Sequence, residues 1–64
     1  MLQEIKVLID TLNGLKSTEL KNWCNIYNIK KSRNGVSNKY VLKLNIFKYE
    51  IGRKPTSKEE YLML

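Results

Sequence analysis

The chain has 64 residues, enough for one domain, and at that length folding buries only about 60% of the surface of the unfolded chain, which leaves no room for a ligand cavity beside the core. Hydrophobic residues make up 42% of the chain, which argues against disorder, while a single cysteine and no histidine exclude an internal disulfide and a zinc site of cysteine and histidine ligands. The net charge of +6 favours a polyanionic partner, and the cysteine usage favours an intracellular protein. We expect no metal or other cofactor.

The N-terminal segment predicts an amphipathic helix over residues 2 to 12, ended by Asn13-Gly14. Its apolar residues recur at the spacing of one helical face: Leu2, Ile5, Leu8, Ile9 and Leu12. Because Glu4 and Asp10 interrupt the segment and no long apolar run follows, we expect neither a signal peptide nor a membrane span.

A second helix is predicted over residues 18 to 28, with Ser17 as its cap and Glu19 in its first turn, where the helix dipole favours a carboxylate. Its apolar face consists of Leu20, Trp23, Cys24 and Tyr27. We therefore expect Trp23 and Tyr27 in the core and not stacked on bases. Cys24 fits a small buried hydrophobe better than a nucleophile, because no histidine can activate it.

The stretch NIKKSRNGVSN, residues 28 to 38, predicts a loop with a turn at Asn34-Gly35. A third helix is expected over residues 38 to 51, capped by Ser37 or Asn38. Its apolar residues form one face of Tyr40, Leu44, Phe47 and Ile51 and an opposite set of Leu42, Ile46 and Tyr49. A helix that is apolar on two faces is normally sandwiched between neighbours, so we place it at the centre of the fold.

The C-terminal segment begins where Gly52 ends the third helix and Pro55 disfavours helix just before it. Residues 56 to 64 predict a short segment opened by a capping box, either Thr56 with Glu59 or Ser57 with Glu60. This segment is either a final helix packed on the core or the start of an element that continues in a longer protein.

Positive charge is concentrated in the middle of the chain. Residues 20 to 49 contain no acid and these seven basic residues: Lys21, Lys30, Lys31, Arg33, Lys39, Lys43 and Lys48. A field of one sign favours nucleic acid or an anionic membrane surface. The alternative is a bias of composition from an A/T-rich coding sequence, although bias alone does not explain why so long a stretch lacks acids.

The basic loop and the start of the third helix are the candidate binding site. Lys39 and Lys43, one helical step apart, flank the free backbone N–H groups of the helix start, which suit a phosphate. The candidate DNA-binding residues are Lys30, Lys31, Arg33, Asn34, Gly35, Ser37, Asn38, Lys39 and Lys43. The alternative is a solvated polar loop with ordinary capping. The six acids form no pair suited to acid/base or two-metal chemistry, so we expect no catalytic activity.

The run LNGLKSTELKNWCNIYNI, followed by a basic loop and NKYVLKLNIFKYEI, resembles the SAP domain, a helix, extended loop, helix module that binds DNA. The matching positions are Leu15, Glu19-Leu20-Lys21, Ile29, Asn34-Gly35, Lys39 and either Val41 or Leu42. The loop is longer than the family pattern. The resemblance implies binding of duplex or branched DNA through the loop and the start of the third helix, within a larger nuclear, mitochondrial or viral protein.

The segment LKSTELK behind an extra N-terminal helix also looks like the SAP-like start of yeast mitochondrial Holliday-junction resolvases. In that case the catalytic acids lie beyond residue 64.

Together these features predict one all-α domain, a small bundle of three to four helices with its helix, extended loop, helix core over about residues 15 to 51. The expected function is non-catalytic DNA binding with little base specificity, tethering a larger DNA-processing protein and using no small-molecule substrate. The main alternative is a helical protein-interaction module that presents the two-faced third helix and the C-terminal YLML. Attachment to anionic lipid is a weaker alternative, because it needs a helix with cleanly divided basic and apolar faces.

Overall fold

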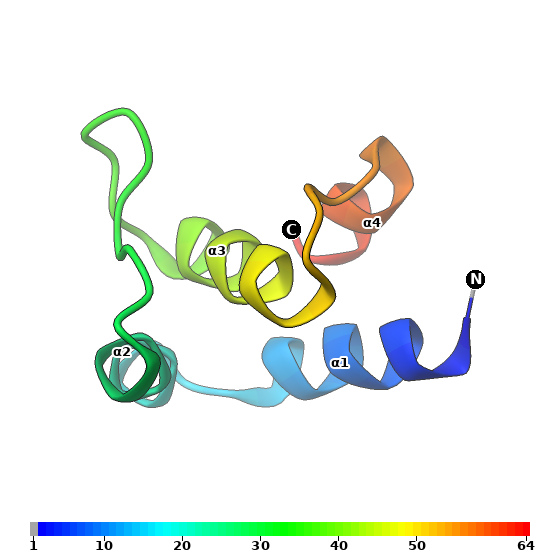
Figure 1. Ribbon diagram of the computed structural model, residues 1–64, viewed down its shortest axis with the longest axis horizontal. Coiled ribbons are helices and arrows are strands. Elements are labelled where there is room, and N and C mark those ends of the chain that lie inside the picture. The colour runs from blue at the N-terminus through cyan, green and yellow to red at the C-terminus, as the bar shows by residue number, and fades with distance from the viewer. Residues whose placement is uncertain (1) are drawn as a thin grey trace.

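Four α-helices and no strand make up the fold over residues 2–64, the part of the chain that the computed structural model describes (Figure 1). The helices are α1 (Gln3–Gly14), α2 (Ser17–Tyr27), α3 (Lys39–Ile51) and α4 (Ser57–Leu62). The all-α class is confirmed, and each predicted helix is present with ends that lie within two residues of the predicted ones. The C-terminal segment forms a short helix.

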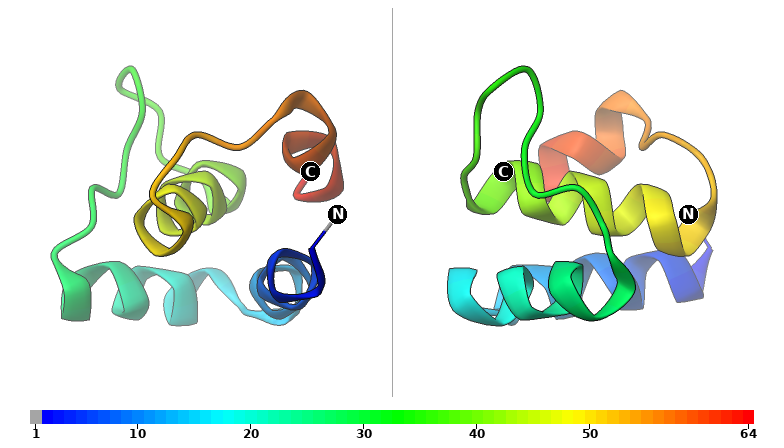
Figure 2. Two further views of the ribbon diagram at one scale, coloured as in Figure 1. Left: turned by 45° about the vertical axis from the view of Figure 1, so that its right-hand side comes forward. Right: turned by 60° about the vertical axis from the view of Figure 1, so that its left-hand side comes forward.

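The third helix lies at the centre of the fold, as predicted. α1 and α2 form one layer, α3 crosses above both, and α4 lies beside α3 and above α1 (Figure 2). Six residues of α3 are buried: Val41, Leu42, Lys43, Leu44, Ile46 and Phe47. Tyr49 departs from the prediction of a second apolar face, because it is 54% exposed.

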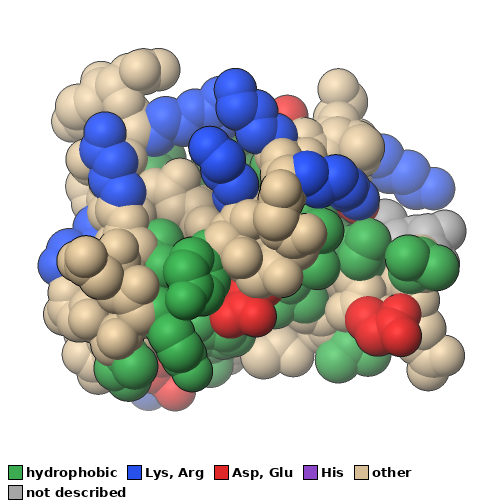
Figure 3. All heavy atoms as spheres, in the orientation of Figure 1, with side chains coloured by type: hydrophobic (Ala, Val, Ile, Leu, Met, Phe, Trp, Pro, Cys, Tyr) green, Lys and Arg blue, Asp and Glu red, His purple; other side chains and the backbone are tan. Residues whose placement is uncertain are grey.

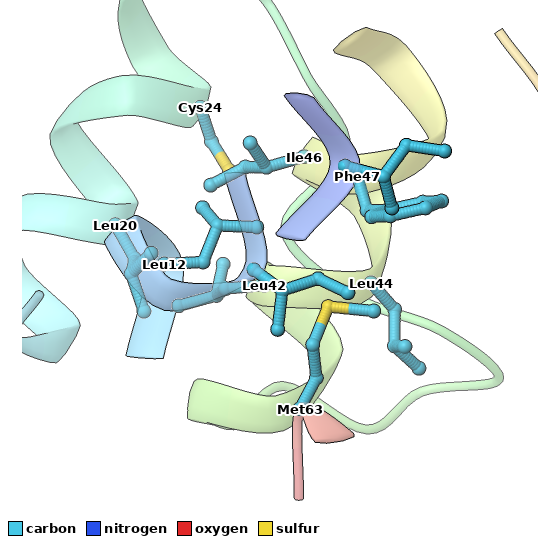
Figure 4. Close-up of a cluster of buried hydrophobic side chains, with 10 residues drawn as sticks. Leu12, Leu20, Cys24, Leu42, Leu44, Ile46, Phe47 and Met63 are labelled. Carbon is cyan, nitrogen blue, oxygen red and sulfur yellow. The ribbon is translucent and has the colours of Figure 1, made fainter. Parts of the chain in front are cut away.

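The core joins side chains from all parts of the chain (Figure 4). The largest fully buried side chains are Phe47, Leu12, Leu20, Leu42, Ile46, Met63 and Cys24. Met63 follows α4 and fills the space beside α3, so the C-terminal segment is docked on the core and does not project from it. Burial of a side chain of this size stabilises the fold by about 1.5–3 kcal/mol.

Side-chain caps fix the starts of α3 and α4. The Asn38 Oδ1 accepts a hydrogen bond from the Val41 N–H at 2.9 Å. The Thr56 Oγ1 accepts one from the Glu59 N–H at 3.3 Å, and the Glu59 carboxylate accepts one from the Thr56 N–H at 2.8 Å. Of the two alternatives in each case, Asn38 is therefore the cap of α3 and Thr56 with Glu59 is the capping box of α4.

The start of α2 differs from the prediction. Ser17 is the first helical residue and not the cap, and Lys16 precedes it in extended conformation. The Glu19 Oε1 accepts a hydrogen bond from the Lys16 N–H at 2.9 Å, so the carboxylate gives this backbone N–H at the helix start a hydrogen-bond partner.

The aromatic face of α2 is only partly buried. Trp23 is half-buried against the core and Cys24 is fully buried, as predicted, and burial raises the pKa of the Cys24 thiol. The prediction for Tyr27 is wrong, because its side chain is 50% exposed. It is the last residue of α2, where Asn28 turns the chain with a φ of 56°, and its ring meets Tyr49 at the surface instead of entering the core.

No helix within residues 2–64 combines the length and the apolar character that crossing a membrane requires.

Candidate nucleic-acid interface

The basic loop between α2 and α3 ends in a tight hairpin. The Arg33 N–H donates to the Val36 carbonyl at 2.8 Å, and the Val36 N–H donates to the Arg33 carbonyl at 2.9 Å. Between them, Asn34 and Gly35 have φ values of 52° and 77°. Two successive positive φ angles are typical of the type I′ turn, for which Asn-Gly is the preferred sequence. The predicted turn at these two residues is confirmed.

Polar side chains fasten this loop to α3 and to itself. The Asn45 amide donates to the Lys30 carbonyl at 2.8 Å and to the Ser32 carbonyl at 3.4 Å. The Ser37 hydroxyl donates to the Lys31 carbonyl at 2.8 Å, which joins the two arms of the loop. The loop is therefore held in one place over α3 by side chains that occupy its backbone acceptors.

An open groove of about 410 Å³ lies between the loop, α3 and the segment that leads into α4. Four basic residues line it: Lys30, Arg33, Lys48 and Lys54. Figure 3 shows the corresponding concentration of Lys and Arg side chains along one side of the molecule, over the loop and the approach to α4. We call this feature the basic groove. Its remaining lining residues are Ser32, Asn34, Leu44, Asn45, Pro55 and Glu60.

Glu60 is the one acid that lines the basic groove. Its Oε2 lies 3.8 Å from the Arg33 Nη1, with side chains 34% and 55% exposed. An ion pair this exposed contributes about 1 kcal/mol or less, so a phosphate that enters the groove can replace the carboxylate beside Arg33. Even with this pair in place, the net charge of the residues that line the groove is positive.

The predicted site residues divide into groups. Lys30, Arg33 and Asn34 line the basic groove, and Gly35 forms the hairpin tip beside it. The Lys31 ammonium instead donates to the Asn25 side chain on α2, away from the groove lining. Lys39 is exposed at the start of α3, outside the residues that line the groove.

The remaining predicted residues hold the fold together. Ser37 and Asn38 use their side-chain oxygens in the loop and cap hydrogen bonds described above, so one N–H of the α3 start is already paired. Lys43 is predicted as a surface contact, but it is only 5% exposed.

The Lys43 ammonium donates to the Asn13 Oδ1 at 3.0 Å, and the Asn13 amide donates to the Leu62 carbonyl at 2.8 Å. Burial, with a smaller contribution from nearby Lys39, lowers the pKa of Lys43. Lys43 thus connects α3 with the ends of α1 and α4 and does not form part of the exposed basic surface.

Two groove residues, Lys48 and Lys54, are not among the predicted site residues. Lys48 follows Asn45 at helical spacing, so these two polar side chains share one face of α3, a signal that the sequence does carry. Lys54 has no comparable signal, because only the path of the chain between α3 and α4 brings it to the groove.

An ion pair between a partly exposed arginine and a buried glutamate sets that path. The Arg53 guanidinium binds the Glu59 carboxylate through two hydrogen bonds of 2.8 and 2.9 Å and lies 5.7 Å from the centre of the Phe47 ring. Glu59 is only 4% exposed. Its hydrogen bonds to Arg53 and to the Thr56 N–H lower the pKa of Glu59 to about 2, against the opposing effect of burial. This pair holds the segment that carries Lys54.

Within residues 2–64, no three cysteine or acidic side chains gather in a way that suits a metal ion. Comparison with protein-family models, with curated proteins and with solved structures finds no match to this chain.

Proposed function

We propose that this chain is a non-catalytic module that binds DNA through the phosphate backbone, with the basic groove as the contact surface. The observation that carries the proposal is the convergence of Lys30, Arg33, Lys48 and Lys54 on one open groove. These residues come from three separate segments of the chain, so their proximity is a property of the fold and not of a local run of lysines. A concave surface with positive charge attracts a polyanion.

Little base specificity is expected of this surface. Lysine and arginine that meet phosphates position a protein on the nucleic acid, whereas contacts to base edges select a sequence. Such a module suits a tether that holds a larger DNA-processing protein on its substrate. The resemblance to the SAP domain supports the role of the loop, but the proposed contact on α3 is Lys48 and not the helix start at Lys39, which lies outside the groove lining.

A role in protein interaction is the second candidate, and one observation favours it. Tyr61, Leu62 and Leu64 are 73%, 41% and 78% exposed at the C-terminal end, while Met63 between them is buried. The other surface expected for such a role, a second apolar face of α3, is largely covered in the fold. The C-terminal residues alone make a small apolar surface.

The experiment is a fluorescence-anisotropy titration of the chain with labelled duplex and four-way junction DNA. The test variant replaces Lys30, Arg33, Lys48 and Lys54 with glutamine. The control variant replaces Lys6, Lys16, Lys21 and Lys58, none of which lines the basic groove, and lowers the net charge by the same amount.

We expect the groove variant to lose affinity by about tenfold or more and the control by less than about threefold, because only contacted phosphates release counterions. Circular dichroism checks that both variants remain helical. Equal losses would assign the affinity to net charge alone. If the unmodified chain binds no DNA even at low salt, the proposal is wrong and the protein-interaction role is favoured.

A further inference from the structure

Two tyrosines that are distant in sequence form an exposed aromatic pair. Tyr27 ends α2 and Tyr49 lies in α3, with ring centres 5.7 Å apart and ring planes inclined by 39°. Each ring packs against the other, yet the side chains remain 50% and 54% exposed. The pair therefore offers aromatic surface to the solvent from a fixed position between two helices.

The tyrosine pair lies next to residues of α3 that line the basic groove. Tyr49 directly follows Lys48, which lines the groove, and lies one helical turn after Asn45. The Asn45 amide in turn holds the carbonyl of Lys30, a groove residue three positions after Tyr27. On the face shown in Figure 3, hydrophobic side chains reach the surface next to the row of Lys and Arg side chains.

Aromatic rings beside a basic groove suit one class of ligand in particular. Single exposed hydrophobic residues are common on proteins and carry no implication by themselves. Proteins that bind single-stranded nucleic acid, however, combine a positive groove for the backbone with aromatic side chains on which bases stack. In a duplex both faces of each internal base are already stacked, so its bases are not available to the rings.

We propose that the ligand of this surface is single-stranded nucleic acid, or an unpaired stretch of a branched one, whose bases stack on Tyr27 and Tyr49 while the adjoining phosphates occupy the basic groove. The inference rests on the proposed DNA-binding function and specifies the nucleic acid that the groove receives. It assigns Tyr27 and Tyr49 to base binding, although the helical spacing of Tyr27 with Leu20 and Cys24 favours the core.

The experiment compares three labelled probes by anisotropy at low salt: an oligothymidylate, an abasic strand with the same number of phosphates, and a blunt duplex. The test variant is Tyr27→Leu with Tyr49→Leu, which keeps apolar contact between α2 and α3 and removes both rings. We expect its affinity for oligothymidylate to fall by about 5- to 150-fold, the range for loss of stacking with one base. Affinity for the abasic strand and the duplex should change by less than about twofold.

Two controls separate stacking from folding. Tyr27→Phe with Tyr49→Phe keeps both rings and should retain the affinity for oligothymidylate. Tyr61→Leu removes a ring that is 73% exposed on α4, outside the groove lining, and should also have no effect. Circular dichroism and the fluorescence of Trp23 report whether each variant is folded, and Tyr27→Leu alone replaces the double variant if that one unfolds.

Two results would overturn the base-stacking inference: the leucine variant keeps its affinity for oligothymidylate, or its affinity falls equally for all three probes. Either result leaves the proposed DNA-binding function intact, provided that the unmodified chain binds the abasic strand and the duplex. If the unmodified chain binds none of the probes, both the inference and the proposed function fail.

Discussion

Lys43 and Lys48 lie on the same helix, but their side chains have different surroundings. The Lys43 ammonium is buried against the Asn13 side chain, whereas Lys48 is exposed and lines the basic groove. Burial of an ammonium disfavours its charged form, which is the cause of the lowered pKa of Lys43. Helical spacing from Lys39 does not reveal this burial, because the neighbours of Lys43 come from α1 and, through Asn13, from α4.

The same substitution should affect DNA binding at Lys48 but not at Lys43. Lys48→Met should weaken DNA binding and lower the salt dependence by about 0.9 in the slope of log K against log salt, the value for one lost phosphate contact. Lys43→Met should leave both unchanged and should alter only the urea midpoint of unfolding, because Asn13 loses its partner. Anisotropy at several salt concentrations measures the first effect. Comparable losses of affinity from the two variants would contradict the assignment of Lys43 to the interior.

The lowered pKa of Glu59 predicts how the stability of the fold depends on pH. Its pKa is about 2 in the folded protein against an ordinary 4.5, because Arg53 and the Thr56 N–H stabilise the carboxylate. A depressed carboxyl pKa stabilises the fold fully above about pH 4.5, and the contribution is lost as the pH falls from there toward 2. Urea unfolding between pH 6 and pH 2 should therefore show a falling midpoint. Glu59→Gln should be less stable at pH 6 and should show a flatter profile, whereas Glu4→Gln, at an exposed site on α1, should follow the unmodified chain.

At the scale of elements, local patterns predict the helices well and their docking only in part. The Asn38 cap, the Gly52 end of α3 and the Asn34-Gly35 turn depend on neighbours within four residues, and all are confirmed. The fastening of the loop by Asn45 is not predictable in this way, since its partners lie 13 and 15 residues earlier in the chain. The exposure of Tyr27 likewise depends on where α2 ends relative to α3.

The hairpin provides a test at this scale. Gly35 has a φ of 77°, and no atom lies within 4 Å of the position of an added Cβ, so any cost of a side chain there is conformational strain and not a clash. Gly35→Val should distort the turn, displace Arg33 and Asn34 from the groove, and lower DNA affinity while the helical circular dichroism persists.

Gly14→Val is the matched control for this variant. It lies in α1 without a positive φ, also has no neighbour within 4 Å, and should leave affinity unchanged. Full affinity in Gly35→Val would show that the loop carries charge without a defined shape, which is the solvated-loop alternative.

For the whole molecule, the basic groove results from folding and not from a contiguous motif. Lys30 and Arg33 are predictable from the basic loop and Lys48 from its spacing to Asn45 on α3, but Lys54 joins them only when α4 docks through Met63 and the Arg53–Glu59 pair. The sequence therefore predicts the positive charge of this surface and the side of the groove that the loop and α3 form. The side near α4 depends on contacts between segments, and the burial of Lys43 depends on the docking of α1 and α4 against α3.

The salt dependence of binding measures how many cations of this assembled surface act together. If Lys30, Arg33, Lys48 and Lys54 each meet one phosphate, log K for duplex DNA should fall against log salt with a slope of about −3.6, from −0.9 per contact. This corresponds to a loss of affinity of about 150-fold between 50 and 200 mM salt. For a single strand, with about −0.7 per contact, the slope should be about −2.8.

Replacing all four cations should bring both slopes close to zero, whereas replacing Lys6, Lys16, Lys21 and Lys58 should leave them unchanged. A slope that falls equally in both variants would mean that the charge acts diffusely over the whole surface. A shallower slope with persistent binding would mean that fewer groove cations reach phosphates. Because base stacking releases no counterions, the tyrosine variants should shift the single-strand affinity at every salt concentration without changing its slope, which separates the aromatic pair from the basic groove in one data set.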